Sequence, residues 1–250
     1  GEGHFCVTPM SYVGVRTSTG VWRATSHTGR GPKRNAERLM ILRRAALLLP
    51  TLALPAPPAP QPLSLAAAAA LVRSAGAPEL LRACAASGAL LYRGEELAGR
   101  PAVLSPPPDL LDDSTYGSAS AAAYFACLQT QLRRRSSRAR PSNGHIGTAR
   151  IADAEAWGAA ASVWPLTGGS LAYVWPEARR AFYPSSGRGC DGPYAVDAGL
   201  ERALEQGHEV LFAAARFVAV PAALDAPLRA ALGLPQAVGR DGAEWTGRKT

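Results

Sequence analysis

Between residues 89 and 220 the apolar side chains come in short runs that are separated by Gly, Pro, Ser and Asn. Strand-like runs occupy residues 89–92, 145–149, 161–166, 171–175, 208–212 and 216–220. Helical spacing of apolar residues lies between them, so helices and short strands intermix along the chain. Several strand candidates are close enough in sequence to form antiparallel hairpins. This pattern predicts a single α+β domain with a mixed or antiparallel sheet and flanking helices.

Helices are predicted from spacing and from stop signals. A helix over 71–87, interrupted at Pro78, is expected to end at Gly88, because glycine readily takes the left-handed conformation that closes helices. Further helices are predicted over 115–135, 151–158, 197–206 and 221–232. Residues 98–109 hold four prolines, so we expect an extended loop there.

Aromatic residues gather between positions 157 and 183. The runs 161–166 and 171–175, joined through Gly168 and Gly169, predict a Trp-rich hairpin. Pro165 places the first run at a sheet edge or at a strand end. These aromatic side chains are expected to pack in the core and the hairpin, although an exposed subset would offer a sugar- or peptide-binding face.

The formal charge of the 250-residue chain is +8, and most of it belongs to the first 73 residues. Residues 1–73 carry nine Lys and Arg against two Asp and Glu, whereas residues 74–250 carry 18 against 17. The nearly neutral remainder lacks the basic surface that nucleic-acid binding requires, so no nucleic-acid partner is expected. The densest basic run of residues 74–250 lies at 133–140. We expect its arginines to be solvated; the alternative is that they bind a phosphate or an acidic partner.

The first 73 residues have the composition of a targeting leader. Residues 7–45 are rich in Ser, Thr and Arg and hold one acid, Glu37. An arginine pair at 43–44 then precedes an apolar run, and small residues at 64–70 offer cleavage sites, so that this stretch resembles a twin-arginine export signal. Together the two parts look like the leader of a thylakoid-lumen protein from an alga or plant.

The resemblance to a leader sets the expected domain organisation. Residues 1–73 form a leader that is disordered or cleaved between Ala66 and Ala75, residues 74–232 form the domain, and residues 233–250 form a polar tail. The expected location is the chloroplast thylakoid lumen, with secretion or membrane anchoring by the apolar run as alternatives. Prolines interrupt that run repeatedly, so no transmembrane span is expected in the mature protein.

Cysteine and histidine give no metal signature. Cys84, Cys127 and Cys190 follow the leader, and no pair has metal-ligand or redox spacing. Three cysteines can form one disulfide and leave one free thiol, or they can all stay reduced, and both alternatives are open. His145 and His208 have no evident third ligand and are expected to be structural, so no metal is predicted.

Three short motifs are the best candidates for chemistry. Residues 91–95 read Leu-Tyr-Arg-Gly-Glu, residues 146–150 read Ile-Gly-Thr-Ala-Arg, and residues 208–212 read His-Glu-Val-Leu-Phe. In this order they resemble the Arg–Ser–Glu pattern of mono-ADP-ribosyltransferases, and the resemblance covers about residues 88–222. In that family a strand-edge Arg contacts the NAD phosphates, a Ser-Thr-Ser strand shapes the nicotinamide pocket, and a Glu at a strand start stabilises the oxocarbenium-like transition state.

The resemblance implies NAD as cofactor and a role for each motif. Arg93 would bind the cofactor, Thr148 would lie in the Ser/Thr strand with Ser162 as a competing candidate, and Glu209 would be catalytic. The chemistry is suitable, because the guanidinium fork matches phosphate and a carboxylate stabilises a developing ribosyl cation. Arginine-modifying members carry Glu or Gln two residues before the catalytic Glu, where this chain carries Gly207.

A non-enzymatic function is the alternative. A lumenal interaction or assembly protein would bind its partner through the Trp-rich hairpin. A transferase predicts that Arg93 and Glu209 face one cleft. An interaction protein predicts that these two side chains lie far apart or are paired with other groups, and that the hairpin is exposed.

Overall fold

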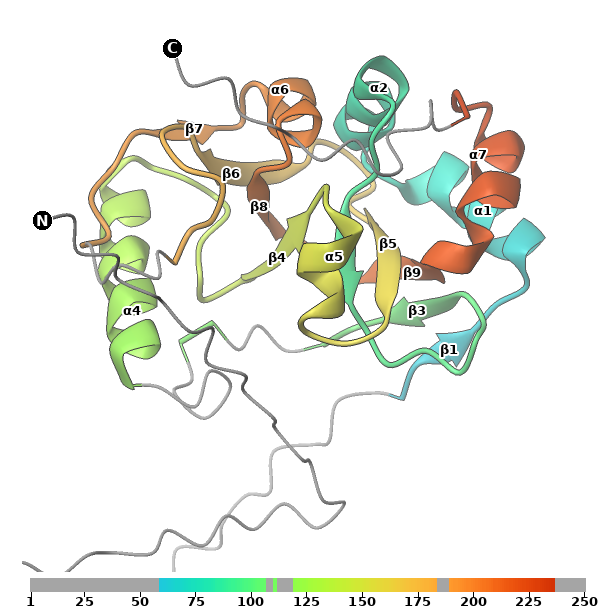
Figure 1. Ribbon diagram of the computed structural model, residues 1–250, viewed down its shortest axis with the longest axis horizontal. Helices are drawn as coiled ribbons and strands as arrows, with labels where there is room; N and C mark the ends of the chain where they lie inside the picture. The colour runs from blue at the N-terminus through green and yellow to red at the C-terminus, as the bar shows by residue number, and fades with distance from the viewer. Residues whose placement is uncertain (1–58, 107–109, 112–118, 184–188, 237–250) are drawn as a thin grey trace, which may run out of the picture. The chain divides into compact units, whose positions relative to one another are not determined.

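The computed structural model describes residues 59–106, 110–111, 119–183 and 189–236 (Figure 1). Residues 1–58, which hold most of the predicted leader, and residues 237–250, which hold most of the predicted tail, lie outside the described residues. The described residues belong to one compact unit.

One antiparallel sheet forms the centre of the described fold. Its strand order is β1-β3-β9-β5-β2-β4-β8-β6-β7, and every pair of neighbours is antiparallel. The strands are β1 (Gln61–Pro62), β2 (Tyr92–Gly94), β3 (Ala102–Leu104), β4 (Gly144–Thr148), β5 (Ala160–Pro165), β6 (Ala172–Pro176), β7 (Tyr194–Val196), β8 (Glu209–Ala213) and β9 (Phe217–Pro221). The predicted α+β class with an antiparallel sheet and flanking helices is confirmed.

The helices begin and end at the signals that the sequence carries. Ser64 caps the first helix, since its Oγ accepts the Ala67 N–H at 3.1 Å. Pro78 opens the second helix, and Gly88, at φ +69°, ends it in the left-handed conformation. The helices are α1 (Leu65–Ala75), α2 (Pro78–Ser87), α4 (Ala119–Arg134), α5 (Ile151–Glu155), α6 (Leu200–Glu205), the 3-10 helix η1 (Ala222–Leu224) and α7 (Asp225–Leu232).

The fold begins before residue 74, where the composition placed the domain boundary. β1 pairs with β3, and α1 buries Ala68, Ala69 and Val72 in the core. Alanine-rich sequence fits a signal-peptide cleavage region and also a closely packed helix, because alanine is both small and a strong helix former. Cleavage between Ala66 and Ala75 would therefore remove part of a packed helix.

Two local predictions are wrong. Strands β5 and β6 do not form a hairpin: β5 pairs with β9 and β2, whereas β6 pairs with β8 and β7. The chain after β5 instead contacts the end of α1, where the Gly168 N–H donates to the Ala75 carbonyl at 3.2 Å. The extended loop expected over 98–109 contains β3, because its short apolar run pairs with β9.

Two apolar clusters fill the fold. The larger one joins the sheet to α1, α2, α6 and α7 and includes Trp164 and Trp175, which are 2% and 1% exposed. The smaller one joins α4 to β6 and β8 through Phe125, Leu128 and Leu211, among others. Figure 1 shows α4 at one end of the sheet, α1 and α7 at the other end, and α5 in front of the central strands.

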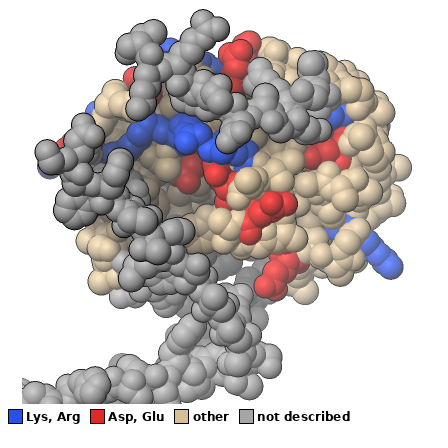
Figure 2. Space-filling model, in the orientation of Figure 1, with Lys and Arg blue, Asp and Glu red and all other residues tan. Residues whose placement is uncertain are grey.

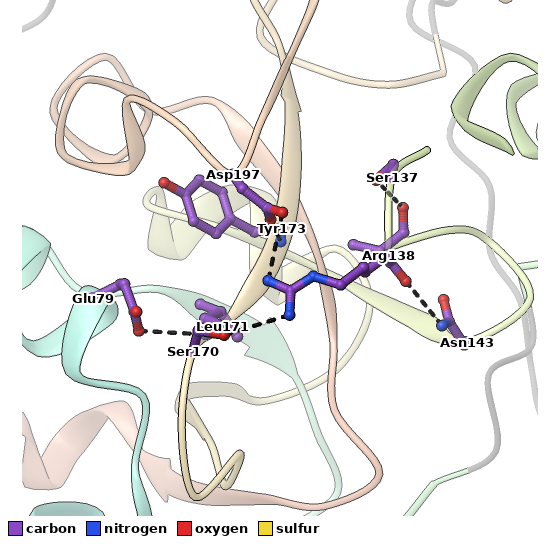
Figure 3. Close-up of polar contacts among 9 residues, drawn as sticks. Glu79, Ser137, Arg138, Asn143, Ser170, Leu171, Tyr173 and Asp197 are labelled. Atoms are coloured by element: carbon purple, nitrogen blue, oxygen red, sulfur yellow. Dashed lines mark hydrogen bonds and ion pairs between the residues drawn. The ribbon is translucent and has the colours of Figure 1, made fainter. Parts of the chain in front are cut away.

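A polar network fixes the start of β6 (Figure 3). Asp197 accepts the Tyr173 N–H at 2.8 Å and forms an ion pair with Arg138 at 3.5 Å. The Leu171 N–H donates to Glu79 of α2 at 3.3 Å. Arg138, part of the basic run at 133–140, thus has a structural contact.

A disulfide joins Cys127 of α4 to Cys190, and Cys84 is a buried free thiol. The structure therefore selects the alternative of one disulfide and one thiol. Within the described residues, no helix combines the length and apolar character that crossing a membrane requires.

Candidate functional site

Three of the four predicted site residues lie in one row across the sheet. Tyr92 of β2 is paired with Ser162 of β5 on one side and with Thr148 of β4 on the other. Thr148 is in turn paired with Glu209 of β8. Directly paired residues of antiparallel strands present their side chains to the same face. The pairing therefore brings together three motifs that are far apart in sequence.

Arg93 lies beside this row, with its side chain toward the other face. It is paired with Ala161, one position on from Tyr92, and successive residues of a strand alternate between faces. Its Nε forms an ion pair with Glu95 at 2.7 Å, and its Nη1 donates to the Ile146 carbonyl at 3.2 Å. The structure thus does not bring Arg93 and Glu209 to one face of the sheet.

Glu209 is a largely buried carboxyl at the start of β8. Its Oε2 accepts the Phe182 N–H at 2.6 Å, and its own N–H donates to the Arg180 carbonyl at 2.6 Å. Burial raises the pKa of Glu209 to about 7; the Asp153 charge acts in the same direction, and the Phe182 N–H and Arg179 oppose it. This carboxyl changes its charge close to neutral pH.

Arg150 lies over the backbone that leads into Glu209. Its N–H donates to the Thr148 hydroxyl at 3.2 Å, and its guanidinium forms a 3.5 Å ion pair with Asp153 of α5. A β-carbon at Gly207, which has φ +70°, would lie 3.0 Å from the Cγ and Cδ of Arg150. Gly207 is therefore required by both its conformation and this close approach.

Arg179 connects the Glu209 site to α4. Its Nη2 donates to the hydroxyl groups of Tyr124 and Tyr194, and its guanidinium lies 5.7 and 5.9 Å from the centroids of the two rings. The Tyr194 ring stacks on Phe182 at 6.1 Å. The segment that contacts Glu209 is thus held by aromatic and cationic packing. Sequence reasoning missed Arg150 and Arg179, and the signal for Arg150 is its place directly after the predicted 145–149 strand.

Ser162 is enclosed at the other end of the row. It is 0% exposed, its Oγ donates to the Val220 carbonyl at 3.4 Å, and that Oγ accepts the Trp164 indole N–H at 3.4 Å. Next to it the Tyr92 hydroxyl donates to Asp225 of α7 at 2.7 Å. These contacts make Ser162 a structural residue that a ligand does not reach.

The two histidines have separate, structural surroundings. His208 is bonded through Nδ1 to the Pro176 carbonyl at 2.7 Å. His145 is 1% exposed and packs against the rings of Phe212 and Phe217. Burial, and to a lesser degree the charge of Arg93, lowers the pKa of His145 to about 4, so the ring is neutral. No group of three or more His, Cys, Asp or Glu in the described part is arranged to hold a metal.

The visible surface carries charges of both signs. Figure 2 shows a band of Lys and Arg side chains with Asp and Glu side chains next to it.

A shallow groove lies between the start of the fold and the residues that follow β2. Pro60, Leu97 and Arg100 are among its lining residues. This groove contains none of the predicted site residues.

Comparison with protein-family models, with curated proteins and with solved structures gave no significant match. The functional argument therefore depends on the geometry of the site and on the motif resemblance.

Proposed function

We propose that this chain is a diverged, NAD-dependent ADP-ribosyltransferase-like protein in which Glu209 is the catalytic carboxylate. The observation that carries the proposal is the direct pairing of Thr148 with Glu209 on neighbouring strands, beside the strand that holds Arg93. A carboxyl whose pKa is raised to about 7, at a strand start, supports it further.

The reaction would be transfer of the ADP-ribosyl group from nicotinamide to an acceptor. NAD supplies a ribose that bears a good leaving group, and positive charge develops on that ribose as the bond to nicotinamide breaks. The ionised Glu209 carboxylate stabilises this charge electrostatically. The Phe182 N–H, at 2.6 Å from Oε2, fixes the orientation of the carboxylate. Because only the ionised form can do this, activity is expected to rise with pH through the pKa of Glu209.

Two arginines are proposed to contact the phosphates. Arg93 follows from the motif resemblance, but its side chain points to the other face of the sheet from Glu209 and is paired with Glu95. Arg150 directly follows the Thr148–Ala149 strand end, and its side chain is 43% exposed. Its side chain lies over Gly207, two residues before Glu209, and this position supports a role for Arg150 near Glu209. Arg150 therefore joins Arg93 as a proposed phosphate ligand.

The thylakoid lumen remains the proposed location, and the composition of the first residues supports it. The Cys127–Cys190 disulfide suits an oxidising compartment or one in which thiols are regulated. For the alternative of partner binding, the hairpin is absent from the described residues and Trp164 and Trp175 are buried, whereas the pairing of Arg93 with Glu95 and the 67% exposure of Trp157 favour it.

Binding calorimetry with NAD on the full chain tests the pocket. The native protein is expected to bind NAD, and Arg93→Ala and Arg150→Ala are each expected to weaken binding by roughly tenfold or more, through loss of a charged phosphate contact. Arg82→Ala, an exposed arginine on α2, is the matched control and should bind normally. No binding heat with NAD at millimolar concentration in a folded sample would refute the proposal.

A further inference from the structure

A continuous set of contacts leads from the disulfide to the Glu209 carboxylate. Cys127 is exposed on α4, whereas Cys190 is 1% exposed and lies 63 residues further along the chain. The bond therefore joins the outer surface of α4 to the chain that enters β7. The disulfide thus has one cysteine at the surface and one inside a buried packing network.

Each step of the set is a direct contact. The Cys190 carbonyl accepts the Tyr194 O–H at 2.6 Å, and the Tyr194 hydroxyl accepts an Arg179 N–H at 2.8 Å. The Tyr194 ring lies nearly parallel to Phe182, with an interplanar angle of 12°. The Phe182 N–H then donates to Glu209 at 2.6 Å. These contacts connect Cys190 to the group that orients Glu209.

We propose that the Cys127–Cys190 disulfide is a thiol-sensitive positioning device, which holds residues 179–182 against the Glu209 carboxylate and releases them when a dithiol reduces it. The inference concerns the carboxylate on which the proposed function rests. Its test needs no NAD, so failure of one proposal is distinguishable from failure of the other.

The chemical step is ordinary thiol–disulfide exchange. A thiolate of the dithiol attacks the exposed Cys127 sulfur, the S–S bond breaks, and the Cys190 sulfur leaves as a thiolate and takes up a proton. The second thiol of the reductant then attacks the first reductant sulfur of this mixed disulfide and expels the Cys127 sulfur, which takes up a proton, while the reductant's two sulfurs form a disulfide. Two electrons pass from the dithiol to the protein. Cys84 takes no part, because burial raises its pKa to about 12.

The charged groups around Glu209 set the direction of the effect. Asp153 of α5 and Arg179 of the chain between β6 and β7 act on the Glu209 carboxyl. Tyr124, which belongs to α4, lies behind Arg179. Burial is the largest cause of the raised pKa of Glu209, ahead of the opposing contributions of the Phe182 N–H and Arg179. Loosening of residues 179–182 admits water and therefore lowers the pKa toward that of an ordinary carboxyl.

The test is a ¹³C NMR titration of the side-chain carboxyls in the full chain, oxidised and after treatment with dithiothreitol. The Glu209 resonance is identified by its absence in Glu209→Gln. We expect a midpoint near pH 7 in the oxidised protein and a midpoint about one pH unit or more lower after reduction. Cys84→Ser should keep this difference. The Cys127→Ser/Cys190→Ser double variant should show the lower midpoint with or without reductant.

Two results would overturn the proposal. The first is an identical Glu209 midpoint in the oxidised and reduced proteins. The second is loss of the whole fold on reduction, seen by circular dichroism, because the disulfide would then be a general stabilising cross-link and not a local device. If the Glu209 titration midpoint depends on the redox state but the protein does not bind NAD, this inference is supported and the proposed function is refuted.

Discussion

Two tyrosine-centred clusters flank the same row of strands; their tyrosines are all 6% exposed, but their arginines differ in burial. At the α7 end, Tyr92 donates to Asp225, while the Arg229 side chain donates to the Gly88 and Pro235 carbonyls. At the α4 end, Tyr124 and Tyr194 hold Arg179, which lies beside Glu209. Arg229 in the first cluster is 3% exposed, whereas Arg179 in the second is half-buried and Arg150, over Gly207, is 43% exposed. The first cluster is therefore closed to solvent, and the second lies next to solvent-accessible cations.

Arg229→Ala should cause the largest loss and would sharpen this distinction. Arg229 is 3% exposed, and its removal takes the donor from the Gly88 and Pro235 carbonyls and the cation from beside the Asp225 carboxyl. A hydrogen bond that involves a charged group contributes about 1.5–3 kcal/mol, and this variant loses two of them. Urea unfolding measures this change. Arg202→Ala, an arginine 56% exposed, is the control and should cost much less; equal losses would contradict a structural role for the α7 cluster.

The pH dependence of stability should report Glu209. Its pKa is raised from 4.5 to about 7 in the folded protein, so its contribution to stability is fully present below pH 4.5 and is lost as the pH rises through 7. The loss would amount to roughly 3 kcal/mol at most, from the size of the shift. Glu209→Gln retains an oxygen for the Phe182 N–H and should remove this dependence.

Urea unfolding at pH 5 and pH 8 compares the two proteins. The native protein should lose more stability than Glu209→Gln between these pH values. A parallel pH dependence in both would show that the Glu209 carboxyl is not held in a buried environment.

Gly207→Ala should have an intermediate effect. At φ +70° an alanine costs about 1–2 kcal/mol, and its β-carbon would lie 3.0 Å from Arg150. Gly168→Ala is a close match, since φ is +60° there and no atom lies within 4 Å. The excess loss in Gly207→Ala over Gly168→Ala, from urea unfolding, measures the Arg150 contact. Equal losses would mean that Arg150 does not lie over Gly207.

Tyr194→Phe should change the free energy of unfolding least among these variants. The variant keeps the ring on Phe182 but loses the hydroxyl that bonds Arg179 and the Cys190 carbonyl, at a cost of about 1 kcal/mol. Tyr183→Phe, 38% exposed, is the control, and its urea midpoint should stay close to that of the native protein. If both variants behave alike, the hydroxyl network does not hold residues 179–182.

Local signals predicted much of the fold. The apolar run 208–212 corresponds to β8, and Gly88 ends α2 as predicted. These predictions succeed because the spacing of apolar residues, helix caps and the backbone freedom of glycine each depend on only a few neighbouring residues. The predicted 161–166/171–175 hairpin failed, because pairing depends on which strands lie next to each other in the finished sheet. Composition assigned α1 to a leader, because alanine-rich sequence carries no mark of what it packs against.

The candidate site could be predicted only in part. The order of the three motifs placed Thr148 and Glu209, which the sheet pairs directly. The Tyr92–Asp225 and Arg179–Tyr124 contacts span 133 and 55 residues, and no local pattern encodes such pairs. The alternation of faces along β2 separates Arg93 from Glu209, and this follows from register, which the sequence did not reveal.

Nicotinamide release from NAD by the native protein and by Glu209→Gln, followed between pH 6 and pH 8, tests the central claim most directly. The account predicts release that increases with pH through about 7 as Glu209 ionises, and a fall of roughly 100-fold in Glu209→Gln. Release that is equal in the two proteins, or absent from a folded native protein at every pH, would contradict it.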